Sequence, residues 1–128
     1  MGIDRADLVV ALQETLMRAA RDFGDVDGFR PHAPRVLATA AALDYVLMLT
    51  RGAAGTRIVE RDAERAIHEG IARAVDDVIF AANAIAEEQT AASTAFAHAA
   101  SKTLREVVRA EGLRTDERAF ALIALANA

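Results

Sequence analysis

The sequence predicts an all-α fold, a four- to five-helix, mostly antiparallel bundle that forms a single domain over residues 1–128. Apolar residues recur at spacings of three and four in every periodic segment, and no segment alternates over the length that a strand needs. Alanine makes up about a quarter of the chain, which lets helices approach closely and leaves few large side chains to shape a cavity. A chain of 128 residues, 53% hydrophobic and 27% charged, is long enough to bury one core.

The first predicted helix covers residues 4–23. Its apolar residues form one stripe and its charged residues lie opposite, which is typical of a helix with one buried side. Gly24 is expected to end this helix as a left-handed glycine just past the last turn. The stripe consists of Leu8, Val9, Leu12, Leu16, Ala19, Ala20 and Phe23.

The second predicted helix, residues 34–51, is apolar nearly all round. Pro34 suits its first turn, where a missing N–H group costs nothing, and Gly52 follows its end. A helix without a polar face is expected to be buried, either at the centre of the bundle or in a subunit contact. Its apolar residues include Val36, Leu37, Leu43, Val46, Leu47, Met48 and Leu49.

A third apolar stripe begins near residue 57 and continues in phase to residue 111. One unbroken helix of that length would reach about 80 Å, too long for a compact domain of this size. We therefore favour a break near residues 89–93, with Thr90 or Ser93 capping the next helix, although one long helix remains the alternative. Gly112 is expected to end the segment as a left-handed glycine.

The final predicted helix begins at Thr115 and carries acidic residues in its first turn, as the helix dipole prefers. Its apolar residues Phe120, Leu122, Ile123 and Leu125 point all round the helix. We therefore expect it to be buried against its own chain or against a partner.

Three places carry side chains that could bind a ligand or act as a switch. Asp44 and Tyr45 lie in the middle of the apolar second helix, where a carboxylate needs a partner or an exposed edge. Glu64 and His68 are four residues apart on one helix face, so they could ligate a metal or simply form a surface pair. His98 is the third place, on the fourth predicted helix.

Residues 96–102 read FAHAASK and place His98 about 200° around the helix from Phe96, hence exposed, with Lys102 one turn further on. This short segment resembles histidine phosphotransfer domains, which are also small helical bundles with an exposed histidine followed closely by lysine. It departs from their pattern, which has lysine three residues after the histidine and glycine next, since Ser101 and Lys102 take those places. The resemblance implies a phosphorelay role through His98.

Several classes of function are disfavoured by composition. Without cysteine there is no disulfide, thiolate metal site or cysteine nucleophile. A net charge of −4, with basic residues interleaved among acidic ones, argues against binding nucleic acid. No export signal opens the chain, and the longest apolar run is about fifteen residues against the roughly twenty that span a bilayer, so we expect a cytoplasmic protein without membrane contact.

The sequence also holds no motif for nucleophilic catalysis or phosphate binding, so we expect no enzyme activity, no cofactor and no metal. We predict an interaction or assembly module, adaptor or structural, that forms a homodimer and engages a larger protein partner. The two apolar helices carry this prediction, because they exceed what one small core can hide, and we expect the contact to form through the last helix, the long third helix, or both. The alternatives are a ligand- or metal-binding regulatory bundle and a histidine phosphotransfer-like module.

Overall fold

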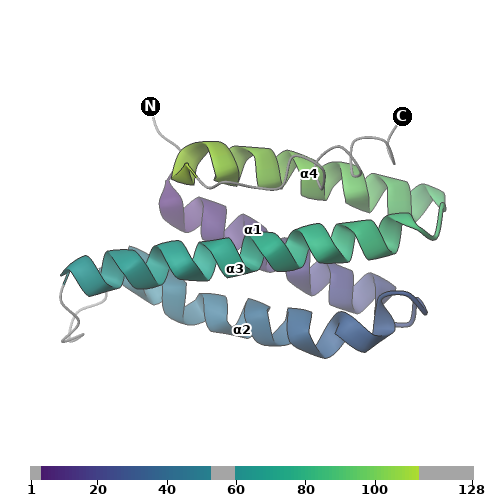
Figure 1. Ribbon diagram of the computed structural model, residues 1–128, viewed down its shortest axis with the longest axis horizontal. Coiled ribbons are helices and arrows are strands. Elements are labelled where there is room, and N and C mark those ends of the chain that lie inside the picture. The colour runs from purple at the N-terminus through teal and green to yellow at the C-terminus, as the bar shows by residue number, and fades with distance from the viewer. Residues whose placement is uncertain (1–3, 53–59, 113–128) are drawn as a thin grey trace.

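The computed structural model describes residues 4–52 and 60–112, and this part of the chain is all-helical (Figure 1). It contains four α-helices and one short 3-10 helix, and no strand occurs within the described ranges. The elements are α1 (Arg5–Phe23), η1 (Arg30–His32), α2 (Ala33–Thr50), α3 (Glu60–Ala86) and α4 (Ala91–Glu111). The predicted stretches 57–59 and 115–128 lie outside the described residues.

Helix α1 matches its predicted range, but its end differs from the prediction. Asp4 caps the start of the helix, where its Oδ1 accepts a hydrogen bond of 3.0 Å from the Ala6 N–H. Gly24 has φ −59° and ψ −22°, so the prediction of a left-handed glycine here is wrong. The chain turns instead through ordinary right-handed backbone, in which the Val26 N–H donates to the Phe23 carbonyl at 3.0 Å.

Helix α2 packs against both α1 and α3, and these contacts cover only one side of it. The approach to α3 is close, since a Cβ atom at Gly70 would lie 2.5 Å from Cγ2 of Val46. Of the two places predicted for this helix, the centre of the bundle is therefore wrong, because four helices that share one core each expose a side. Its buried residues are Val36, Thr39, Ala40, Leu43, Val46, Leu47 and Leu49.

The structure settles how residues 60–111 are divided, and confirms a break between two helices. Helix α3 ends at Ala86, and Gln89 adopts a left-handed conformation with φ 56°. Thr90 then caps α4: its Oγ1 accepts from the Ser93 N–H at 3.0 Å, while Ser93 Oγ accepts from the Thr90 N–H at 2.8 Å. At the other end, Gly112 is left-handed with φ 64°, as predicted.

One hydrophobic core lies between the helices. All four contribute to it, and its largest fully buried side chains include Leu12 and Leu16 of α1, Leu43 of α2, Ile71 and Ile85 of α3, and Leu104 of α4. The loop between α1 and η1 adds Phe29, which is completely buried. The described residues therefore share a single core.

Candidate interaction surface

The outermost side of α2 is an apolar surface that no described residue covers. Its members recur at spacings of three and four and are all exposed, so they form one stripe along the helix. Leu37 is 49% exposed, Tyr45 47% and Met48 39%. We call this stripe the outer face of α2; it consists of Pro34, Leu37, Ala38, Ala41, Ala42, Tyr45 and Met48.

The edge of the outer face nearest α1 carries one carboxylate. Asp44 is exposed, and its Oδ1 accepts a 2.7 Å hydrogen bond from Nε2 of Gln13, which also donates to the Ala40 carbonyl at 2.9 Å. Asp44 thus lies on an exposed polar edge, one of the two arrangements expected for it. Next to this edge on α1, Met17 adds a further apolar side chain that is 52% exposed.

The edge of the outer face nearest α3 lies beside a buried carboxylate of α3. Asp77 is 2% exposed and accepts a hydrogen bond from the Thr39 hydroxyl, and its Oδ1 lies 2.8 Å from Nη2 of Arg35. A buried carboxylate needs such partners, because charge is costly to remove from water. The arrangement links α2 to α3 and holds the guanidinium group of Arg35 beside Asp77.

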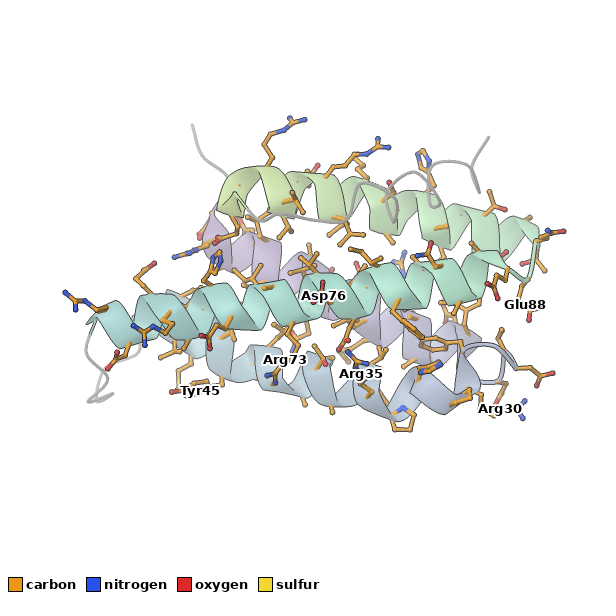
Figure 2. All side chains as sticks on the ribbon, in the orientation of Figure 1. Arg30, Arg35, Tyr45, Arg73, Asp76 and Glu88 are labelled. Atoms are coloured by element: carbon orange, nitrogen blue, oxygen red, sulfur yellow. The ribbon has the colours of Figure 1, made fainter. Side chains whose placement is uncertain are left out.

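A hollow of about 360 Å³ opens beside the outer face, between α2 and α3. Ala38 and Ala42 form its apolar lining together with Thr39, and Arg35 and Arg73 bring cationic groups to it. Figure 2 shows these two arginines between the ribbons of α2 and α3, with Tyr45 extending from α2 further along the helix. The outer face thus combines a projecting aromatic ring with an alanine-lined depression.

Glu64 and His68 belong to a different site, where the start of α1 meets α3 and the end of α4. Arg5 lies at its centre: its Nη1 is 2.6 Å from Glu64 Oε2, and its Nε is 2.6 Å from Glu111 Oε1. Nη2 donates a second bond of 2.8 Å to Glu111 Oε2, and His68 Nδ1 lies 3.8 Å from that oxygen. The group ties three helices together.

The electrostatics of this cluster follow from its geometry. The carboxylate side chain of Glu111 is only 5% exposed, and the two hydrogen bonds from Arg5 hold its pKa below the usual value of 4.5 against the opposing effect of burial. Glu111 in turn raises the pKa of Arg5, so both groups stay charged. Among the described residues no group of three or more His, Cys, Asp or Glu side chains is placed to hold a metal ion.

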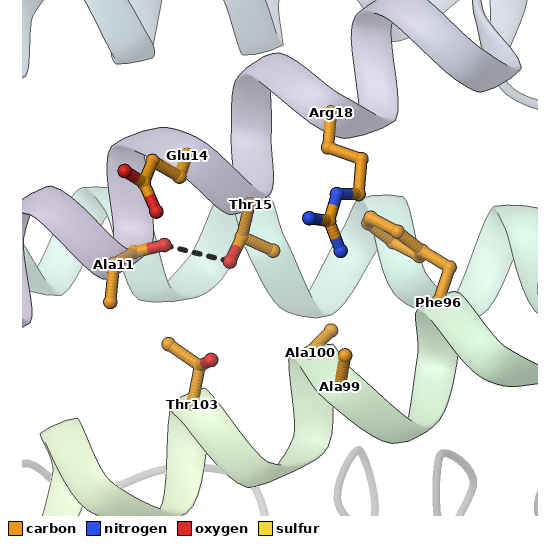
Figure 3. Close-up of a pocket in the computed structure, with 8 residues that line it drawn as sticks. All are labelled: Ala11, Glu14, Thr15, Arg18, Phe96, Ala99, Ala100 and Thr103. Atoms are coloured by element: carbon orange, nitrogen blue, oxygen red, sulfur yellow. Dashed lines mark hydrogen bonds between the residues drawn. The ribbon is translucent and has the colours of Figure 1, made fainter.

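His98 and Lys102 are both exposed on α4, as the sequence predicts. On the side of α4 that faces α1 there is a hollow of about 180 Å³, lined by Ala99, Ala100 and Thr103 (Figure 3). Across it, the Thr15 hydroxyl donates to the Ala11 carbonyl at 2.7 Å, so that hydroxyl is already used within α1. His98 is not among the residues that line this hollow.

The residues that matter most were not all found by sequence reasoning. Arg5 and Glu111 are 106 positions apart, and no local pattern connects them. Asp77 directly follows Asp76 in the sequence, yet Asp77 is buried while Asp76 is exposed. Its position on the stripe, three residues after Ala74 and four before Ala81, is the signal that could have identified it.

By length and composition alone, the segment from Arg30 to Thr50 could also cross a membrane. In the structure 39% of its apolar window is buried inside the protein, and a core helix passes the same test. This finding is weak evidence of a membrane-spanning helix. It reflects the same apolar residues that form the outer face of α2.

Comparisons with protein-family models, with curated proteins and with solved structures found no match for this chain.

Proposed function

We propose that this protein is a small interaction module whose four described helices form a mostly antiparallel bundle, and that it associates with a second copy of itself through the outer face of α2. The protein would act through this surface, alone or while presenting another surface to a larger partner in the cytoplasm, with no catalytic chemistry of its own.

Contacts between residues distant in sequence support the antiparallel arrangement. Arg5 at the start of α1 meets Glu111 at the end of α4, as expected of helices that run in opposite directions. Gln13 of α1 pairs with Asp44 of α2, and only the four residues 87–90 separate α3 from α4. Short connections of this kind join antiparallel neighbours.

The observation that carries the proposed function is the exposure of Leu37, Tyr45 and Met48 along a single helix face. Scattered exposed apolar residues are normal, but a continuous stripe with only alanine between the large side chains is a mark of an interface. Burying such side chains contributes about 25 cal/mol for each Å² of apolar area removed from water.

The polar groups near the outer face do not oppose this role. Asp44 lies at its edge, already bonded to Gln13, and Arg35 reaches back to Asp77. Asp44 and Arg35 can keep these partners when the stripe is covered, which lowers the cost of closing an interface.

Light scattering coupled to size-exclusion chromatography tests the proposal over a dilution series. We expect a mass of twice 13.6 kDa at micromolar concentration. A monomer of 13.6 kDa that persists at that concentration would contradict self-association.

A further inference from the structure

The outer face of α2 carries both halves of a self-complementary contact. Counting from Ala41, the large residues Leu37 and Tyr45 lie four positions before and after, and small residues lie between them. A stripe that is small in the middle and large at both ends has the same pattern in either direction. Such a stripe fits a second copy of itself in the opposite orientation.

This symmetry restricts the possible pairing. In a two-fold, isologous contact each residue at one distance before the axis meets the partner residue at the same distance after it. With the axis near Ala41, Ala38 faces the neighbourhood of the partner's Tyr45, and the two Ala41 side chains meet. Helices that cross at alanine approach to about 8 Å, the short end of the range of interaxial distances.

We propose that two copies of this protein pair through antiparallel α2 helices that cross at Ala41, with Tyr45 of each subunit inserted into the hollow beside Ala38 and Ala42 of the other. This inference rests on the proposed function and adds to it the orientation, the axis and the anchoring residue.

The hollow suits an aromatic ring. Its 360 Å³ volume is lined by two alanines, which leave room for the ring, and Thr39 adds further lining. Arg35 and Arg73 can place guanidinium groups against the ring face, an attraction that strengthens when the pair is removed from water. Arg35 is already oriented by Asp77, so less side-chain freedom is lost when the ring enters.

Charge also favours a second copy over a charged partner. The stripe itself carries no ionised side chain, and the groups at its two edges are of opposite sign, Asp44 near α1 and the two arginines near α3. A strongly acidic or strongly basic surface would meet like charge along one edge, whereas the stripe of a second copy brings no ionised side chain to the contact itself. A lipid bilayer offers no ring to fill the hollow.

Single cysteines map this contact cleanly, because the chain has none of its own. Ala41→Cys places a thiol at the proposed axis, where two such residues fall within the Cα separation of about 4.4–6.8 Å that a disulfide requires. Ala95→Cys is the matched control, since Ala95 is also an exposed alanine within a helix. Under mild oxidation at micromolar protein, we expect at least about tenfold more disulfide-linked dimer for Ala41→Cys.

Two substitutions test the insertion of the ring. Tyr45→Ala should raise the dimer dissociation constant at least about tenfold, as loss of a buried aromatic anchor does, whereas Tyr45→Phe should retain most of the affinity. Ala38→Leu should also weaken the dimer, although it adds apolar area, because it fills the hollow. Circular dichroism and the melting temperature establish that each variant is folded, and Ala38→Val provides a smaller filling substitution.

The outcomes separate this inference from the proposed function. A dimer in which Ala41→Cys cross-links no better than Ala95→Cys, or which Ala38→Leu strengthens, would overturn the pairing while leaving self-association standing. A monomer would contradict both. A monomer that floats with phosphatidylcholine–phosphatidylglycerol vesicles would contradict both and assign the outer face of α2 to a lipid surface.

Discussion

Helices α2 and α3 lie side by side and distribute their apolar residues in opposite ways. Helix α3 has a sharp division: its apolar stripe from Ile67 to Ile85 faces the core, and its other side is charged. Its one large exposed apolar residue, Phe80, packs edge-on against His32 with ring centroids 4.3 Å apart. The exposed charged and histidine residues are Arg61, Asp62, Glu64, Arg65, His68, Glu69, Arg73 and Asp76.

Helix α2 is buried on the side that touches α1 and α3, yet it remains apolar on the side that touches neither. The difference shows what the apolar residues of a helix do and do not reveal. Their number indicates how much apolar area must be removed from water, but not how much of that area the other described helices cover. In α3 the other helices cover nearly all of the apolar area. In α2 the outer face is left uncovered, and this uncovered apolar area is the physical basis for the proposed self-association.

The largest expected effect on the free energy of unfolding comes from comparing an alanine substitution on α3 with one on α2. Ile71→Ala on α3 removes a fully buried side chain and should reduce the free energy of unfolding by about 2–5 kcal/mol. Leu37→Ala on α2 should change it by no more than about 0.5 kcal/mol when the protein is dilute enough to be monomeric. Urea denaturation measures both, and a comparable loss at Leu37 would show that the outer face is covered within the subunit.

A second comparison concerns the carboxylate that joins the two helices. Asp77→Ala leaves the buried Thr39 hydroxyl without its acceptor and should cost about 2 kcal/mol of unfolding free energy. Asp76→Ala is the matched control, because the neighbouring side chain is exposed and should contribute less than about 0.5 kcal/mol. Equal effects would refute the role given to Asp77 in fixing α2 to α3.

A third prediction concerns acid, because Arg5 of α1 forms ion pairs with Glu64 of α3 and with Glu111 of α4. The pKa of Glu111 is lowered in the folded protein, so its stabilising contribution is present above its usual pKa of 4.5 and is lost as pH falls through the folded value. Glu111→Gln should therefore be less stable at pH 7, and its difference from the wild type should shrink below pH 4.5. Unfolding curves from pH 7 to 3 measure this, with the exposed Glu106→Gln as control; a constant difference would contradict it.

The smallest expected effect lies at the end of α3. Gln89 holds a left-handed conformation that glycine adopts without steric cost, so Gln89→Gly should stabilise the protein by at most about 1 kcal/mol. Glu88→Gly, on the residue before it, should give no gain. Thermal unfolding of the two variants tests this, and a destabilised Gln89→Gly would mean that the Gln89 side chain makes a contribution larger than the relief of strain.

Sequence patterns predicted the four described α-helices well, because their start and stop signals are local. Thr90 and Gly112 behave as expected, since a cap depends only on residues within one turn of it. Gly24 did not, because backbone hydrogen bonds in the following turn keep it right-handed. The outer face of α2 was not predicted for another reason: which side of an apolar helix is covered depends on the neighbouring helices. The contact between Arg5 and Glu111 was not predicted either, because these residues meet only once the fold is formed.

Sedimentation equilibrium of the wild type beside two arginine variants tests most directly whether the outer face of α2 is an interface. Ala41→Arg places a charge at the centre of the stripe, and Ala95→Arg makes the same change on α4. The wild type and Ala95→Arg should both sediment at twice 13.6 kDa, and Ala41→Arg at 13.6 kDa with unchanged helical content. A monomeric wild type, or an Ala41→Arg variant that stays dimeric, would contradict the account.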